Sequence, residues 1–343
     1  QSIGPRLGGL LTKDIGELKR IFLSPGPIFD PEDRMDDYWG YTEAFYSVGF
    51  RPGDVVQLTF YYHLSPAGLM FEEPLRNLGC ASIPAGPTDP GTQLDIMQKL
   101  RVSGYVGTAS YLMHLAQKAE EKGINLRKDL FQEVASVTGE RLSEKMRNQL
   151  EKKFDIILRQ GYGTADVGCI GYECFHKTGL HISNRCYVEI CHPDTGIPLK
   201  DGEVGEIVVT SFNKTYPLIR LATGDLSYID PAPCACGRTS PRLGSIVGRV
   251  DTTARIKGMF VYPHQVEQVM ARFEDIKRWQ IEVINPGGID EMILYVEASN
   301  FHQEDELLHL FRERIKLRPE LKVLAPGTLP PQIKPIEDKR EWD

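Results

Sequence analysis

The first half of the chain alternates short apolar runs with stretches of helical periodicity, and no other sequence feature restricts the fold more strongly. Apolar runs of about four to eight residues favour strands, and longer amphipathic segments favour helices. We predict strands at 55–60, 81–85, 105–109 and 134–138, and helices at 35–48, 67–78, 94–100, 111–122 and 143–153. Strands separated by helices form βαβ units, so the expected fold class is α/β with a parallel sheet.

The pattern changes near Tyr187. The stretch "YVEICHPDTGIPLKDGEVGEIVVTS" is typical of β runs joined by Thr-Gly and Asp-Gly turns. We therefore expect a small antiparallel β unit over 187–247. A helix at 263–272, a hairpin at 278–298 and a helix at 303–316 then predict a small C-terminal α+β domain. A chain of 343 residues favours two domains, which we place at 1–248 and 249–343.

Composition restricts the partners and the compartment. The chain has 40 Lys and Arg against 47 Asp and Glu, a net charge of −7, which argues against nucleic acid or an anionic membrane as the main partner. No apolar run approaches the roughly 20 residues of a membrane helix, and no secretion signal is visible at the N-terminus. We expect a cytoplasmic protein that binds small molecules; the oligomeric state stays open, with a homodimer as one form.

Three stretches carry candidate chemistry. In "QGYGTADVG" the glycines allow close backbone approach, the aromatic ring can cover a base, and Asp166 can hold Mg²⁺ or a hydroxyl. Asp225 follows Thr223-Gly224 after a β run, and its carboxylate can accept both ribose hydroxyls. Gly248-Arg249 lies at the expected domain boundary. Taken singly, each has a structural alternative: a tight turn, a Gly-Asp turn, and a linker before a capped helix.

In their order and spacing, these stretches resemble the adenylate-forming (AMP-binding) superfamily. The phrases "FRPGDVVQ", "SPRLGSIVGRVD" and "KGMFVYPHQVEQV" are most similar to its phenylacetate–coenzyme A ligase branch, which includes deazaflavin-coenzyme synthetase-like proteins. The resemblance implies a large N-terminal α/β domain and a small mobile C-terminal domain. It also implies an AMP-forming ligase that activates a small acid, expected to be aromatic, with ATP and Mg²⁺ and transfers it to coenzyme A.

The resemblance assigns roles to the first motif. Tyr162, Gly163 and Thr164 match the aromatic-glycine segment that contacts the adenine and the acyl end of the adenylate. Asp166 stands where the family usually has the Glu that holds Mg²⁺, and this makes it a catalytic candidate.

Other positions of the family's nucleotide site are also matched. Gly139 and Glu140 resemble the strand end that lines adenine, Asp225 the ribose-binding Asp, and Arg249 the arginine near the ribose and the hinge. Thr252 stands where the hinge Asp is usual, and rotation there is expected to switch between the half-reactions.

The acid pocket and the catalytic lysine are matched less closely. Tyr62 and His63 resemble the aromatic gate of the acid pocket, although a packed loop explains the histidine equally well. Lys334 is the nearest candidate for the lysine that stabilises the charge of adenylation, which the family usually carries in a Gly-Lys pair.

The phosphate-binding loop departs from the family pattern. The family has a Gly/Ser/Thr-rich loop ending in Gly-Lys, whose backbone N–H groups hold the ATP phosphates. Here "IFLSPGPIFDPED" has prolines without N–H groups, and acids that repel phosphate, at positions Pro25, Pro27, Asp30, Pro31, Glu32 and Asp33. An alternative function follows: a degenerate ligase-like protein that binds AMP or an acyl-adenylate without forming it.

Cysteine and histidine also suggest a metal site. Six of the seven cysteines lie between Cys169 and Cys236, which favours a reduced chain with a metal site over a disulfide framework. Cys174, His181, Cys234 and Cys236 form the preferred set for a structural, tetrahedral Zn²⁺, with His176 as the substitute ligand. The alternative is a group of small buried thiols.

Overall fold

The computed structural model describes residues 6–24, 28–250, 254–256, 259–284, 291–331 and 333–340, and it divides into two compact units. The first unit contains 1–223 and 228–245, and the second contains 224–227 and 246–343. The units are not contiguous in sequence, because Asp225 and Leu226 pair with Arg249 and Gly248. The domain boundary expected between 248 and 249 stays a prediction.

Helices occur in both units. The 3₁₀ and α helices are η1 (Arg6–Gly9), η2 (Ile15–Glu17), α1 (Thr42–Val48), α2 (Ala67–Asn77), α3 (Pro90–Lys99), α4 (Ala109–Glu121), α5 (Glu144–Phe154), α6 (Pro263–Met270) and α7 (Glu304–Ile315). The strands are β1 (Arg20–Ser24), β2 (Ile28–Glu32), β3 (Val55–Leu58), β4 (Ala81–Pro84), β5 (Gly104–Gly107), β6 (Val134–Val137), β7 (Ile157–Thr164), β8 (Gly168–Glu173), β9 (Leu180–Ile182), β10 (Cys186–Cys191), β11 (Gly205–Ser211), β12 (Leu221–Ser227), β13 (Ile229–Asp230), β14 (Arg242–Leu243), β15 (Gly248–Arg249), β16 (Ala254–Ile256), β17 (Met259–Val261), β18 (Arg278–Ile284), β19 (Glu291–Glu297), β20 (Glu320–Leu324) and β21 (Ile336–Asp338).

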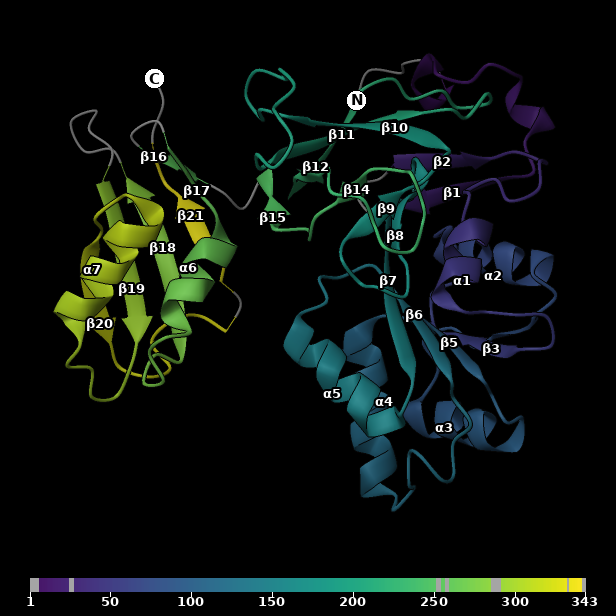
Figure 1. Cartoon of the computed structure of the whole chain (residues 1–343), viewed down its shortest axis with the longest axis horizontal. Coiled ribbons are helices and arrows are strands. Elements are labelled where there is room, and N and C mark those ends of the chain that lie inside the picture. Colours follow the sequence, from purple (N-terminus) through teal and green to yellow (C-terminus); the bar gives the residue numbers. More distant parts are fainter. Residues whose placement is uncertain are drawn as a thin grey trace. The chain divides into compact units, whose positions relative to one another are not determined.

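A nine-stranded sheet forms the centre of the first unit, in the order β13-β14-β9-β8-β7-β6-β5-β3-β4 (Figure 1). The pairs β3–β4, β3–β5, β5–β6 and β6–β7 are parallel, so the expected parallel α/β sheet is confirmed. From β7 onward the sheet continues antiparallel through β8, β9, β14 and β13. Part of the expected antiparallel region therefore belongs to the large sheet.

Two expected helices have different starts in the structure. Helix α1 begins at Thr42 instead of residue 35, because Gly40 takes a left-handed φ of +71° and the aromatic residues before it pack into the core in non-helical chain. Helix α3 begins at Pro90 instead of residue 94, because Asp89 caps it by accepting a 3.0 Å hydrogen bond from the Thr92 N–H.

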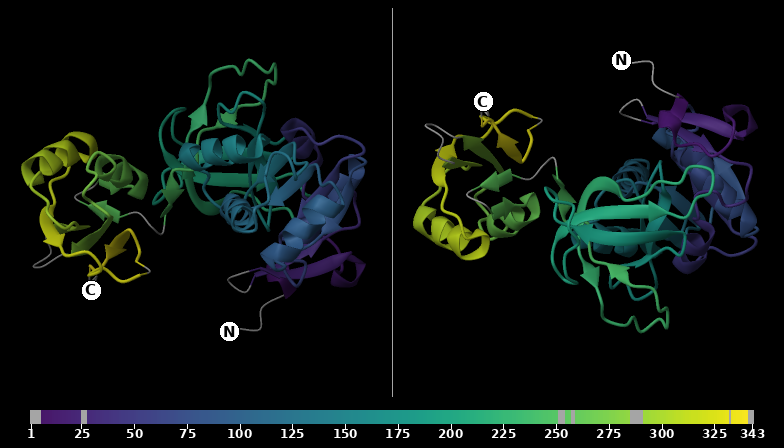
Figure 2. Two further views of the ribbon diagram at one scale, coloured as in Figure 1. Left: turned by 90° about the horizontal axis from the view of Figure 1, so that it is seen from below. Right: turned by 90° about the horizontal axis from the view of Figure 1, so that it is seen from above.

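Helices cover both faces of the parallel strands. Helices α1 and α2 pack on one face against Leu58 and Val106, and α3, α4 and α5 pack on the other against Tyr105 and Leu158. Figure 2 shows these helices from two further sides. Strands β5 and β6 are buried along their whole length, as expected for central strands of an α/β sheet, whereas the edge strand β4 is more exposed.

Two smaller sheets accompany the large one. The β1–β2 hairpin is antiparallel and contains the described part of the expected phosphate loop. A four-stranded sheet has the order β10-β11-β12-β15, and its β10–β11 pair confirms the hairpin expected after Tyr187.

The second unit has an α+β core of its own. Its four-stranded sheet has the order β20-β19-β18-β21, in which β18 and β19 form the expected antiparallel hairpin. Helices α6 and α7 pack side by side against buried residues of that sheet, including Ile281 and Leu294. The expected fold class is confirmed in both units.

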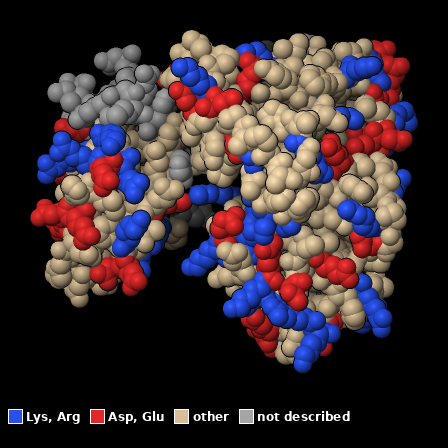
Figure 3. All heavy atoms as spheres, viewed as in Figure 1, with Lys and Arg blue, Asp and Glu red and all other residues tan. Residues whose placement is uncertain are grey.

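The described helices and the charged surface bear on two properties, a membrane span and a patch of one charge. In the described part of the chain, no helix is long and apolar enough to span a bilayer. Figure 3 shows basic and acidic side chains interspersed over the face in view.

Candidate active site

Three groups of candidate residues lie beyond the carboxyl ends of parallel strands. Gly139 and Glu140 follow β6, Tyr62 and His63 follow β3, and the segment 162–164 ends β7. Strands β3, β6 and β7 run parallel in one sheet, so these segments share one edge. This is the edge at which sheets of this class bind ligands.

The "QGYGTADVG" stretch is the end of β7 and its turn into β8. The Thr164 hydroxyl accepts a 3.2 Å hydrogen bond from the Val167 N–H and closes the turn. Tyr162 is 9% exposed, and its hydroxyl donates to Thr223 Oγ1 at 3.2 Å. A Cβ at Gly163 would collide with the Gly168 carbonyl oxygen and the Tyr41 hydroxyl. Packing within the protein therefore already requires glycine here, independently of any nucleotide.

Asp166 lies in this turn, close to an unusual buried carboxylate. Asp30 of β2 is fully buried, and within the described residues neither of its oxygens completes a hydrogen bond. Burial raises the pKa of Asp30 to about 6, with a further rise from the Asp166 carboxylate, against the lowering effect of the Ser24 hydroxyl. Two carboxylates thus meet where the hairpin approaches the turn, and no short motif predicts this pair.

The other acids of the expected phosphate loop are paired with cations. Glu32 contacts the Lys19 ammonium at 2.9 Å and the Arg20 guanidinium at 3.0 Å. Asp33 contacts Lys13 at 2.8 Å. Of the three acids expected to repel phosphate, only Asp30 keeps an uncompensated carboxylate. Pro25 and Pro27 lie outside the described residues.

Glu140 uses its carboxylate within the protein. Its oxygens accept hydrogen bonds from the Ser110 N–H at 2.5 Å and the Ser110 hydroxyl at 2.8 Å, at the first turn of α4. Its backbone oxygen accepts from Gln160 Nε2 at 3.3 Å, which joins the end of β6 to β7.

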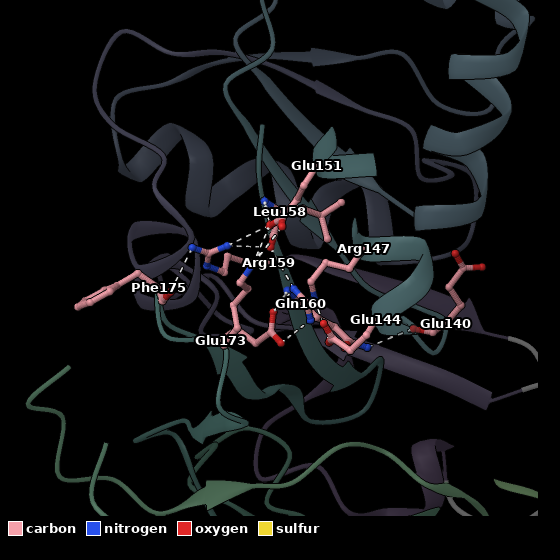
Figure 4. A network of polar contacts seen from close by, with 10 residues as sticks. Glu140, Glu144, Arg147, Glu151, Leu158, Arg159, Gln160, Glu173 and Phe175 are labelled. Carbon is pink, nitrogen blue, oxygen red and sulfur yellow. Dashed lines mark hydrogen bonds and ion pairs between the residues drawn. The ribbon is translucent and has the colours of Figure 1, made fainter. Parts of the chain in front are cut away.

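A buried ion pair joins α5 to β8, and its carboxylate also contacts the backbone of β7 (Figure 4). Arg147 of α5 donates to both oxygens of Glu173 on β8, at 2.9 and 2.6 Å. Glu173 also accepts from the Gln160 N–H at 2.7 Å, two residues before Tyr162. Sequence analysis missed this pair, because charged residues in a helix and a strand are ordinarily expected at the surface.

Three described candidate residues, Asp225, Arg249 and Lys334, belong to the second unit, and the first two interact there. Arg249 Nη1 contacts Asp225 Oδ1 at 2.8 Å across the β12–β15 pair, and Gly224 before them has a φ of +76°. The side chain of Asp225 is 16% exposed and that of Arg249 50% exposed. Lys334 is exposed, and its backbone oxygen accepts from Gln280 Nε2 at 3.2 Å. Thr252 lies outside the described residues.

The two residues of the expected acid gate differ in burial. The Tyr62 ring packs against Gly68 at the start of α2, and its buried hydroxyl has no hydrogen-bond partner among the described residues. Burial raises the pKa of Tyr62. His63 is exposed beside it.

The four preferred metal candidates come together in the first unit. The ligand atoms of Cys174, His181, Cys234 and Cys236 all lie within 4.8 Å of one another. Burial, and then the Arg238 and Arg242 cations, lower the pKa of His181, which favours the neutral ring. His176 is exposed and is not in the group; its ring lies 4.3 Å from that of Phe175, centroid to centroid.

A cavity of about 1090 Å³ lies beside this Cys/His group, and Cys234, Arg238 and Ser240 are among its lining residues. Its lining includes none of the predicted nucleotide-binding residues. The cavity and the edge with Tyr162 are therefore separate features of the first unit.

Two family models match the chain. The model of the AMP-binding enzyme matches residues 40–214, and that of the AMP-binding enzyme C-terminal domain matches residues 258–340. The first match alone covers half of the chain and includes most of the large sheet.

Similar proteins carry matching names. The phenylacetate-coenzyme A ligase of Thermus thermophilus is 32% identical over 83% of this chain and 69% of its own length. That of Escherichia coli is 28% identical over 83% of this chain and 68% of its own length. Other relatives with this name are matched over 58% of their length, so the chain spans only part of the proteins it resembles.

Solved structures confirm the fold. An open conformation of 2-hydroxyisobutyryl-CoA ligase, in complex with 2-HIB-AMP and CoA, has a TM-score of 0.84 at 21% identity. The match covers 98% of this chain and 78% of that one. The family-model match and the 32% identical relative show that the chain belongs to the AMP-binding enzymes, and within them to the phenylacetate–coenzyme A ligase branch of the acid–thiol ligases.

Proposed function

We propose that the protein activates a small carboxylic acid, preferably aromatic, as its adenylate and transfers the acyl group to coenzyme A. In the first half-reaction a carboxylate oxygen attacks the α-phosphorus of ATP, and pyrophosphate leaves. In the second, the thiol sulfur attacks the acyl carbon, the thiol loses its proton, and AMP leaves. The observation that carries the proposal is the convergence of segments 62–63, 139–140 and 162–164 on one edge of a parallel sheet in a member of this family.

The adenosine end is supported by residues of defined geometry. The Tyr162 hydroxyl donates to Thr223, which holds the side chain in place, and we infer that its ring packs against the base. We infer that Asp225 accepts hydrogen bonds from the ribose hydroxyls, with Arg249 beside it to orient the carboxylate.

Asp166 of the β7–β8 turn and Asp30 of β2 offer oxygen donors that suit Mg²⁺. The two buried Asp30 oxygens lack hydrogen-bond partners in the described chain, and Asp166 lies beside them, so hard oxygen donors of the type that Mg²⁺ prefers are present. Asp166, with Asp30 next to it, would hold the ion. When bound, Mg²⁺ neutralises phosphate charge. Lys334, which is exposed, is the proposed cation for the charge that develops on the α-phosphate.

Exchange of labelled pyrophosphate into ATP tests the proposal. We expect exchange that depends on an added aryl acid such as phenylacetate, and a large reduction in Asp166→Ala. The alternative function, binding without adenylate formation, predicts that AMP binds in calorimetry while no acid of a broad aryl and aliphatic panel supports exchange. The comparisons give that alternative no support, and exchange by the unaltered protein would exclude it.

A further inference from the structure

Two stretches far apart in sequence, 174–181 and 234–236, bring three thiols and one imidazole together. Cys174 follows β8, His181 lies on β9, and Cys234 and Cys236 lie in the loop between β13 and β14. We propose that this group is a resident zinc site with a Cys₃His ligand set, separate from the adenylation chemistry.

Two distances within the group match those of a tetrahedral zinc site. Bonds of about 2.3 Å to sulfur and about 2.0–2.1 Å to nitrogen place two sulfur ligands about 3.8 Å apart, and a sulfur and a nitrogen about 3.6 Å apart. Here Cys174 Sγ and Cys234 Sγ are 3.7 Å apart, and Cys236 Sγ and His181 Nε2 are 3.4 Å apart. Both spacings are those of neighbouring ligands around one ion.

The same distances argue against other uses of these thiols. A disulfide needs sulfurs about 2.05 Å apart, and all seven cysteines are free. A group of ordinary buried thiols would not require a fully buried histidine whose Nε2 faces a sulfur. The convergence of four ligands of two types, three thiols and one imidazole, favours a metal.

Neighbouring groups orient the ligands as in known metal sites. The Ser240 hydroxyl contacts His181 Nδ1 at 3.2 Å, which leaves Nε2 directed at the thiols. The Arg238 N–H donates to Cys236 Sγ at 3.5 Å, a contact that suits a thiolate. Such outer contacts fix the ring orientation and support the charge of metal-bound sulfur.

The ligand set determines the role of the ion. Four protein ligands leave no open coordination position, so the zinc is structural. It links the end of β8 and strand β9 to the loop before β14, at the antiparallel end of the large sheet. The loop also forms part of the wall of the 1090 Å³ cavity.

Metal analysis of the purified full chain, under reducing conditions, tests the proposal. We expect about one zinc per chain, because closed thiolate sites bind zinc tightly near pH 7. The Cys234→Ser/Cys236→Ser variant should lose the metal and melt more than about 5 °C lower. Cys80→Ser is the matched control, since Cys80 is buried outside the group and its sulfur lies 3.3 Å from the Arg51 carbonyl oxygen; it should keep the zinc.

A second measurement tests the proposal even if the Cys234→Ser/Cys236→Ser variant does not fold. Wild-type protein stripped of metal and given Co²⁺ should show the visible spectrum of tetrahedral cobalt, with thiolate charge-transfer bands, and Ser240→Ala should bind Co²⁺ about 10–100-fold more weakly. Metal-free protein from zinc-supplemented culture that also fails to give this spectrum would overturn the proposal. Equal zinc loss in Cys80→Ser would do the same.

Discussion

Removing the charge of Glu173 should destabilise the first unit strongly. The side chains of Arg147 and Glu173 are 3% and 6% exposed, and two hydrogen bonds of 2.9 and 2.6 Å join them. Loss of one partner from such a buried pair leaves an uncompensated charge and costs about 3–5 kcal/mol. In Glu173→Gln the amide oxygen can accept only one of these two bonds, and Arg147 keeps its bonds to the Leu158 carbonyl and to the exposed Glu144, each at 3.1 Å. We therefore expect a cost toward the lower end of that range.

Urea unfolding followed by circular dichroism measures this loss, with the transition of the first unit fitted separately from that of the second. A double-mutant cycle with Arg147→Met separates the pair from its surroundings. Because Arg147→Met removes the cation that Glu173→Gln leaves unpaired, the double variant should cost less than the sum of the single ones, by about 2 kcal/mol or more. Lys118→Met, which removes an exposed ion pair with Glu121, is the control and should cost less than about 1 kcal/mol.

The ion pair also bears on the site. Glu173 accepts a hydrogen bond from the Gln160 N–H, two residues before Tyr162, so Glu173→Gln should also weaken AMP binding. A single-variant cost below about 1 kcal/mol, or additive costs in the cycle, would refute the reasoning.

Three further predictions concern the turn and the ribose residue. Because burial raises the pKa of Asp30 from 3.8 to about 6, its ionised form destabilises the folded state, and this penalty grows as pH rises from about 4 to above 6. Asp30→Asn should therefore gain about 1–3 kcal/mol relative to wild type in Mg²⁺-free buffer at pH 8 and almost nothing at pH 4, and a pH-independent difference in melting would contradict this. Asp225→Ala should weaken AMP binding by about 1.5–3 kcal/mol in calorimetry, and unchanged affinity would remove Asp225 from the nucleotide site. Gly163→Ala should cost about 1–3 kcal/mol without any nucleotide, because its Cβ meets the Gly168 carbonyl, and an unchanged melting temperature would show that β8 can shift.

Local sequence determined the elements and the order of the motifs. Strands β3, β4, β5 and β6 and helices α2, α4 and α5 lie within one to two residues of their expected bounds at most ends, because apolar periodicity records which face of an element is buried. Two helices have bounds that differ from the expected ones because a local feature was missed. Helix α1 is shorter because of Gly40 and the aromatic residues before it, and α3 is longer because of the Asp89 cap. The family motifs could be identified for the same reason, since each lies within a short segment.

Only the tertiary structure decided which distant segments meet. Asp30 lies beside Asp166, and Arg147 pairs with Glu173. The Cys/His set is the exception, because its residue types indicated the grouping that the structure shows. Strands β13 and β14 join the large sheet instead of a separate antiparallel unit. Such contacts depend on strand order, register and burial, which no short window of sequence contains. Periodicity shows that a residue is buried, but the partner that compensates its charge or shares its metal is set by the packing of the whole chain.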